Sequence, residues 1–301
     1  MRITGSSARR QALGAAAIAA SAALSAQTTV PPDMTTILSR VGERVADYYK
    51  RGESIVLREK ATVIEIGRNY SPEGFARVTE YELHLEPSTD GDGTPGGNIV
   101  RQLLKINGRA PRPGDKKDRN GCTDSNPVSP EPLAFLLSAN RGEYRFTLVG
   151  RGKGKDKNAL LIDFASGRSE GDGKLIEDPN GHPDCYSFSI PVTVKGRLWI
   201  DAATFDVVRF EQHIAGPGDI RVPTEQQRKH NLPDRITIDR HDTTIRYNRV
   251  SFKDPEETVV LPESIDTVIL IRNGLQSVRK RQEFSEYRRF LTGGRIVKEP
   301  G

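Results

Sequence analysis

The spacing of apolar residues changes after residue 52 from a helical to a strand-like period. Over residues 34–50, apolar side chains recur at intervals of three and four, which predicts an amphipathic helix. Asp33 stands before this segment as a candidate N-cap, and Gly52 lies just beyond its end. The first regular element is therefore expected to be a single helix.

Strand-like alternation dominates the remainder of the chain. In residues 77–86, for example, the apolar Leu83 alternates with Glu82 and His84, as in a strand with one buried face. Twelve such runs predict a sheet of roughly ten strands or slightly more. They lie at 54–67, 77–86, 99–106, 144–148, 160–164, 186–194, 196–201, 205–214, 243–252, 258–262, 265–272 and 277–290. Because helices do not separate these runs, parallel βαβ units are not expected, and the sheet is predicted to be antiparallel.

Several segments between these runs are rich in Gly, Pro or charged residues. Residues 89–98 predict a mobile loop, and residues 107–130 and 216–235 predict irregular insertions, the second with one helical turn near its centre. Residues 132–138 carry the apolar stripe of a short helix that packs on a sheet. Because no low-complexity linker divides residues 27–301, we expect them to form one domain.

The first 26 residues have the layout of a secretory signal peptide. Three arginines precede an apolar run that ends in small residues, with cleavage expected near Ala26–Gln27 and a site at Ala23 as the alternative. The run is shorter than the ~20 residues of a membrane-spanning helix, and no transmembrane span is predicted anywhere in the chain. The adjacent Arg9 and Arg10 leave twin-arginine export open beside the ordinary route. The predicted location is periplasmic or secreted.

Export changes the meaning of the net charge. The whole chain is formally +5, but the segment before Gln27 holds three arginines and no acidic residue, which leaves +2 for the remainder. So small a charge gives no support for binding to nucleic acid. The basic and aromatic residues near the C-terminus are therefore interpreted as a strand with one charged face.

The two cysteines, Cys122 and Cys185, lie in polar, turn-rich stretches. In an oxidising compartment such a pair is expected to form a disulfide. Free or metal-bound thiols are the alternative, although the chain has no CxxC motif and only His182 lies near either cysteine.

Residues 196–209 form a strand–turn–strand motif. They read G-x-L-W-I-D-x-x-T-x-x-V-x-R, with Asp201 and Thr204 placed to bond backbone groups of the turn. This pattern resembles the LolA/LolB/RseB-like superfamily of bacterial periplasmic proteins, and the overall layout is similar to secreted families of soil bacteria, especially Acidobacteria.

The resemblance implies a fold and a function. The fold would be mainly β (α+β), a large antiparallel sheet curved into a half-barrel, with the N-terminal helix and one short inserted helix on its concave side. Carriers of this superfamily bind acyl chains between barrel and helices. The resemblance therefore implies a lipid or lipoprotein acyl chain as ligand, without a cofactor.

Residue patterns give little support for catalysis or metal binding. The five histidines show no HExxH or other metal-ligand spacing. Residues 167–171 match G-x-S-x-G, but they are interpreted as a polar loop and not as the strand-to-helix turn that a nucleophilic serine requires. A hydrolase with a dispersed site, built around His213, His230 or His241, stays open as a minor alternative. Residues 239–242 are interpreted as a solvent-exposed cluster of ion pairs.

Two sets of binding residues are predicted. Residues that would line an apolar cavity are Trp199, Phe210, Tyr247, Tyr81, Phe135 and Leu136. Residues that would make a weak contact to an anion, at a Gly-rich turn, are Arg151, Lys153 and Lys155. The leading hypothesis is a non-enzymatic exported protein that binds an apolar ligand or senses an envelope partner through its concave face. A protein–protein interaction module without a small ligand is the alternative.

Overall fold

The first helix, α1 (Met34–Gly52), begins and ends close to its predicted limits. A computed structural model of the chain describes residues 33–52, 55–89, 95–112, 131–167, 173–177, 186–253, 256–273 and 275–289. The Asp33 carboxylate accepts the backbone N–H of Thr36 at 3.0 Å and its hydroxyl at 2.7 Å, which confirms Asp33 as the N-cap. The buried face of α1 presents Ile37, Val41, Val45 and Tyr49.

Thirteen strands of the described chain form one sheet. They are β1 (Ile55–Ile66), β2 (Pro72–Thr89), β3 (Pro95–Ile106), β4 (Tyr144–Arg151), β5 (Ala159–Ser166), β6 (Gly173–Glu177), β7 (Tyr186–Ser189), β8 (Val194–Asp201), β9 (Val207–Ile214), β10 (Gly218–Arg221), β11 (Arg235–Lys253), β12 (Glu256–Arg272) and β13 (Val278–Arg289). The helical segments besides α1 are η3 (Glu131–Leu136), η4 (Arg141–Glu143), η5 (Gly154–Asp156) and α2 (Thr224–His230).

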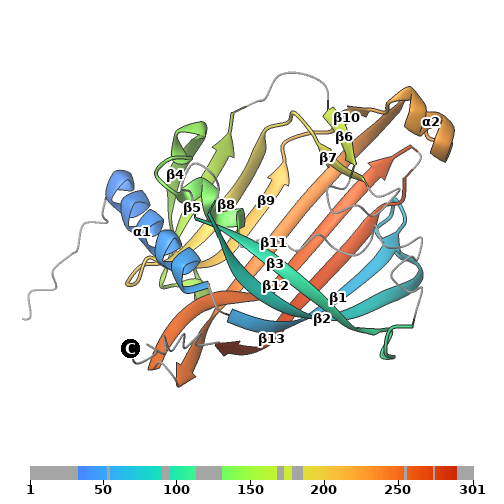
Figure 1. The fold of residues 1–301 in the computed structure, drawn as a ribbon. Helices are drawn as coiled ribbons and strands as arrows, with labels where there is room; N and C mark the ends of the chain where they lie inside the picture. Colours follow the sequence, from blue (N-terminus) through green and yellow to red (C-terminus); the bar gives the residue numbers. More distant parts are fainter. Residues whose placement is uncertain are drawn as a thin grey trace, which may run out of the picture. The chain divides into compact units, whose positions relative to one another are not determined.

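The main sheet runs in the order β3-β2-β1-β13-β12-β11-β9-β8-β5-β4, and every pair along this path is antiparallel. A side branch adds β10, β6 and β7, and the short β10–β6 pair is parallel. Along the described path β3 and β4 are the two ends, so the sheet is open. The predicted mainly β, antiparallel half-barrel is confirmed (Figure 1).

Residues paired across the strands form rows that alternate between the two faces of the sheet. One inner row is mostly apolar and is buried except at its partly buried last member, Leu148. It comprises Ile106, Thr79, Ala61, Gln282, Ile265, Ile245, Phe210, Leu198, Ile162 and Leu148. The neighbouring outer row is polar, and comprises Asp163, Arg197, Glu211, Thr244, Asp266, Arg281 and Thr62. This one-sided burial explains how a chain with 35% hydrophobic residues forms so large a sheet.

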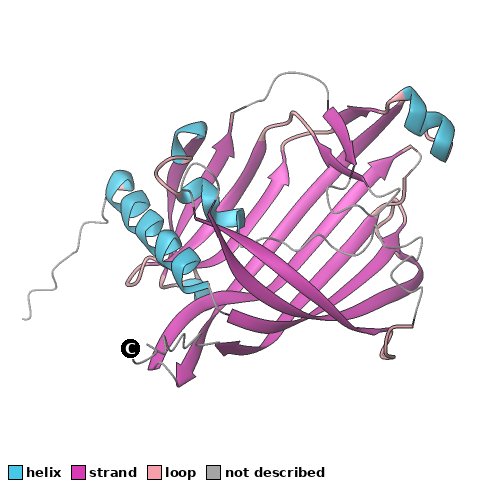
Figure 2. Ribbon diagram, viewed as in Figure 1, coloured by secondary structure: helices cyan, strands magenta, loops and turns pink. Residues whose placement is uncertain are grey.

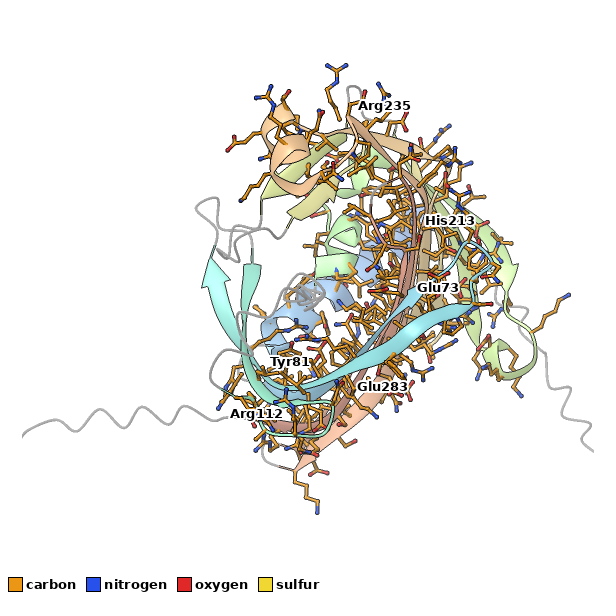
Figure 3. All side chains as sticks on the ribbon, turned by 90° about the vertical axis from the view of Figure 1, so that its right-hand side faces the viewer. Glu73, Tyr81, Arg112, His213, Arg235 and Glu283 are labelled. Atoms are coloured by element: carbon orange, nitrogen blue, oxygen red, sulfur yellow. The ribbon has the colours of Figure 1, made fainter. Side chains whose placement is uncertain are left out.

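The helices α1 and η3 lie together on the inner, concave face of the sheet, over the β4–β5–β8 end (Figures 1 and 2). Seen edge-on in Figure 3, both lie within the hollow on the side of Tyr81, whereas His213 lies on the outer side. The largest buried apolar cluster therefore forms between these helices and the inner face. Its sheet members include Leu160, Ile162, Phe164, Leu198, Ile200, Phe210, Ile245 and Tyr247.

Two predicted boundaries of regular structure are wrong. Residues 95–98, expected in a mobile loop, belong to β3 and pair with residues 86–89, because backbone ladder bonds do not require apolar side chains. The insertion 216–235 contains β10 and α2, of which only the helical turn is predicted.

Several strands are longer than their predicted runs, and the difference is largest for β11 and β12. β11 begins at Arg235 rather than residue 243, and the runs 258–262 and 265–272 are one strand. Pro262 lies at the end of the first of these runs and pairs with Tyr247 beside a register shift, where its missing N–H is tolerated. The inserted helix is a 3-10 segment, η3.

No helix within the described ranges is both long and apolar enough to span a membrane. The predicted signal peptide at residues 1–26 and both cysteines, Cys122 and Cys185, lie outside the described residues. The signal peptide and the disulfide therefore stay predictions.

Candidate functional site

An aromatic cluster lies where η3 meets the inner face of the sheet. The Phe135 ring, carried by η3, has its centroid 4.8 Å from those of Tyr144 and Phe164. It lies 5.9 Å from the ring of Phe210 and 6.1 Å from that of Phe146. Offset and edge contacts of this kind stabilise beyond simple area burial. Phe135 thus fills the apolar hollow formed by β4, β5 and β9.

The neighbouring Leu136 anchors η3 beneath α1. Its side chain is completely buried, and its carbonyl oxygen lies 3.1 Å from the position that a Cβ on Gly42 would occupy. The small residue in α1 therefore allows the two helical segments to approach closely. The Asn140 amide donates to the carbonyl of Ala134 at 3.0 Å and satisfies the end of the segment.

Gly196, the first residue of the β8 motif, makes room for the aromatic cluster. A Cβ at this position would lie 2.0 Å from the carbonyl oxygen of Glu211 and 2.4 Å from the ring of Phe164. Phe164 is the cross-strand partner of Gly196. The motif therefore requires glycine at this position, because any side chain would collide with the Phe164 ring and the neighbouring backbone. The sequence alone did not indicate this requirement.

The turn after β8 connects the motif to α1. Asp201 accepts the backbone N–H groups of Ala203 and Thr204 at 2.9 and 3.0 Å, in the capping role predicted for it. The Thr204 hydroxyl donates to Asp206 at 2.7 Å, and Arg44 of α1 donates to the same carboxylate at 2.8 Å. This hydrogen bond raises the pKa of Arg44 above its ordinary value. The turn therefore holds α1 against the end of the sheet.

A cleft opens between α1 and the sheet beside this turn. Its rim is charged, with Arg44, Asp47, Arg51 and Asp206, and its walls are mostly apolar, with Val45, Tyr48, Leu133, Val207, Tyr247, Thr258, Val259 and Val260. Burial raises the pKa of the Tyr48 and Tyr247 hydroxyls well above the ordinary value, so both phenols stay neutral at any physiological pH. The cleft offers an apolar interior with a polar entrance.

This cleft is small as it stands. It holds about 30 Å³ of space for water molecules, enough for about two. An acyl chain would need far more room, because ligand pockets usually reach ~300 Å³ or more. Side chains of α1 and η3 fill the adjoining space, so an apolar ligand requires these two segments to move.

A second apolar cluster covers the β1–β2 side of the concave face and includes Tyr81. Within this wall Glu59 is completely buried, and its carboxylate accepts Arg101 at 2.5 Å and the Gln282 amide at 2.6 Å. The Arg101 guanidinium lies 5.0 Å from the centre of the Tyr81 ring. A buried carboxylate is tolerated when it is paired in this way. The alternation pattern did not reveal this polar cluster, because a Glu in a strand normally indicates the solvent face.

The residues predicted to line a cavity fall into three places. Phe210, Tyr247, Phe135 and Leu136 lie together in the cluster under α1 and η3, and Tyr81 lies in the second cluster. Trp199 lies on the outer face, with the Arg209 guanidinium 4.4 Å from its ring. Its neighbours Leu198 and Ile200 occupy the inner face instead.

Arg151, Lys153 and Lys155 are all exposed at the turn between β4 and β5, in the region predicted to contact an anion. Strands lie on both sides of this turn, so it differs from a phosphate-binding loop between strand and helix.

Two of the three histidines considered for catalysis, His213 and His241, do not line the cleft. His230 is the last residue of α2, and its side chain lies outside the described part of the structure. His213 is exposed on the outer face, where its cross-strand partners are Lys195 and Asp242. His241 lies on the inner face of β11, and burial lowers its pKa. Within the ranges that the structure describes, no group of His, Cys, Asp and Glu side chains is arranged to hold a metal ion. Residues 239–242 form ion pairs, Arg240 with Asp242 and Asp239 with Arg272.

Comparison with solved structures returns bacterial proteins that are similar to this chain at low sequence identity. The fold is similar to that of a LolA superfamily protein. That protein, from Nitrosomonas europaea, is 10% identical and has a TM-score of 0.34, over 87% of this chain and 97% of its own. A DUF1329 family protein from Desulfovibrio piger is 9% identical and has a TM-score of 0.31, over 83% of this chain and 94% of its own. No protein-family model and no curated protein sequence matches the chain.

Proposed function

We propose that the protein is an exported, non-enzymatic binder of an apolar or lipidic chain, which it takes up between the concave face of the sheet and the cover formed by α1 and η3. The observation that carries this proposal is the position of Phe135. A six-residue segment inserts this ring into a hollow lined by four aromatic side chains of the sheet. The ring occupies the kind of space that an apolar ligand would take.

Binding would exchange the cover for the ligand. When α1 and η3 move away, the apolar inner rows of the sheet become available to an acyl chain. Burying roughly 400 Å² of apolar ligand surface contributes about 10 kcal/mol at ~25 cal/mol per Å². Part of that energy offsets the lost contacts of Phe135 and the cost of association, which leaves an affinity in the micromolar range.

The charged rim would hold the closed state and position a headgroup. Arg44 and Arg51 connect α1 to Asp206 and Glu257 of the sheet side, at 2.8 and 3.8 Å. Both guanidinium groups are partly exposed, so these ion pairs are weak and reversible. These ion pairs therefore add little to the apolar contacts that hold the cover, and a ligand must replace mainly those apolar contacts when the cover opens.

The proposal is tested by native mass spectrometry of the mature protein from a bacterial periplasm, followed by extraction and titration with the fluorescent lipid parinaric acid. We expect a co-purifying lipid that extraction removes, and saturable binding afterwards. Phe135→Glu should abolish both signals, whereas Phe75→Glu, at a fully exposed phenylalanine, should leave them intact. A bare wild-type polypeptide that binds no parinaric acid would refute the proposal.

A protein–protein interaction module is the second candidate, and one observation favours it. Phe75 is fully exposed at the start of β2, where a register shift lets residues 74–76 bulge from the pairing with β1. Aromatic side chains are enriched at protein–protein interfaces, so an exposed phenylalanine suits this function. Loss of envelope-protein crosslinks in Phe75→Glu, with no bound lipid in the wild type, would favour this function.

A further inference from the structure

Many cations of the outer face form ion pairs, but one hairpin gathers several that do not. Arg197 pairs with Asp163, Arg281 with Glu283 and Arg288 with Glu82, among other pairs. The hairpin between β4 and β5 brings together four exposed cations that have no carboxylate partner within the described part of the chain. These four residues, here named the basic hairpin, are Arg151, Lys153, Lys155 and Lys157.

The local fold keeps these four side chains in solvent. Backbone bonds from Gly152 to Ala159 and from Asp156 to Lys153 close the hairpin at 2.9 and 3.1 Å. A Cβ on Gly152 would lie 2.2 Å from the carbonyl oxygen of Asp156, so only glycine permits this closure. Asp156 is the hairpin's single acidic residue, which leaves a local charge of +3 over residues 151–157.

The basic hairpin stands beside the cleft. Asn158, directly after it, accepts the backbone N–H of Ala202 at 2.9 Å, and Ala202 belongs to the turn that carries Asp206. Asp206 in turn forms the rim of the cleft together with Arg44. A surface that binds the basic hairpin would therefore face the end of the sheet at which the cleft opens.

We propose that the basic hairpin docks the protein on an anionic lipid bilayer. The attraction is one of charge complementarity between three lysines, one arginine and the phosphate-rich surface. Lysine is a compact charge on a long stem, which suits a diffuse array of headgroups better than a shaped site on a protein. Val149, half exposed on the outer face of β4, adds an apolar side chain next to the cations. An acidic protein surface is the competing partner.

The test is sedimentation of the full mature chain with vesicles of phosphatidylcholine alone or mixed with phosphatidylglycerol. We expect binding to the mixed vesicles that weakens as salt increases. The triple variant Lys153→Gln, Lys155→Gln, Lys157→Gln should bind roughly 100-fold more weakly, at about fivefold for each charge removed. A matched variant with the same net charge, Lys60→Gln, Lys174→Gln, Lys195→Gln, replaces exposed lysines elsewhere and should bind like the wild type.

Several outcomes would overturn the proposal: equal binding to both kinds of vesicle, equal losses in the two triple variants, or binding to polyglutamate but not to phosphatidylglycerol. Parinaric acid titration of the basic-hairpin variant separates this surface from the concave face. Docking predicts unchanged uptake of the soluble probe together with lost vesicle binding. If the wild type binds the mixed vesicles but does not bind parinaric acid, the ligand proposal fails and the docking proposal stands.

Discussion

Replacement of Phe135 by alanine tests whether η3 closes the hollow of the sheet. The substitution removes a ring that lies within 6.1 Å, centroid to centroid, of four other aromatic rings. It leaves the backbone of η3 and the buried Leu136 in place. The expected product is a folded protein with an apolar cavity beneath its cover.

The magnitude follows from the burial of the ring. Truncation of a fully buried phenylalanine costs about 3–5 kcal/mol, through lost transfer energy and the cavity that remains. Phe135 is only partly buried, so we expect about 3 kcal/mol. In a domain of this size that corresponds to a fall in Tm of roughly 6–12 °C. The new cavity should also increase the affinity for parinaric acid, because the ligand no longer displaces the ring.

Urea denaturation followed by circular dichroism measures the stability, and titration with the probe measures the affinity. Phe75→Ala is the matched control, since the same atoms are removed from a fully exposed site and the expected change is within about 0.5 kcal/mol. Equal effects of the two substitutions would refute the reasoning. A large loss of stability together with weaker probe binding would show that Phe135 supports the site rather than blocks it.

Three further predictions concern single contacts. Arg44→Gln should lower stability by about 1 kcal/mol, with most of the effect absent when Asp206 is already Asn, as a double-mutant cycle would measure. Gly196→Ala should cost about 3 kcal/mol in urea unfolding, because the added methyl meets backbone and the Phe164 ring. Burial lowers the pKa of His241 below its ordinary value of 6.5, so the neutral form stabilises the folded state above pH 6.5. This contribution to the free energy of unfolding should be lost as the pH falls through the lower folded-state pKa. Unfolding curves of His241→Gln at several pH values should lack that loss.

The sequence was informative about the fold wherever a single period governed a segment. The 3.6-residue spacing located α1 to within two residues, and alternation located β1 and β13. It failed where backbone pairing continued through polar or Pro-containing sequence, as in residues 95–98 and at Pro262. Ladder hydrogen bonds between backbones explain these extensions, and they leave no trace in side-chain hydrophobicity.

The candidate site was less accessible to sequence reasoning. The sequence was sufficient to select four residues of the site, because they are aromatic or apolar and belong to predicted elements: Phe135, Leu136, Phe210 and Tyr247. Alternation alone, however, does not show which face of a strand is the inner one. Trp199 is adjacent to two strongly buried positions, Leu198 and Ile200. Its ring nevertheless lies on the outer face, because the order of the strands in the sheet turns the opposite face of β8 inward. Contacts between distant strands also create the buried set around Glu59, and no local pattern encodes such contacts.

The outward position of Trp199 has a practical consequence for spectroscopy. It is the single tryptophan of the chain, and its ring lies under Arg209, on the opposite side of β8 from Leu198 and Ile200. Its fluorescence will therefore change when β8 and β9 separate but will respond little to molecules on the inner face. The protein thus contains an intrinsic optical probe of sheet integrity that is independent of occupancy, so unfolding and uptake can be recorded separately in the same sample.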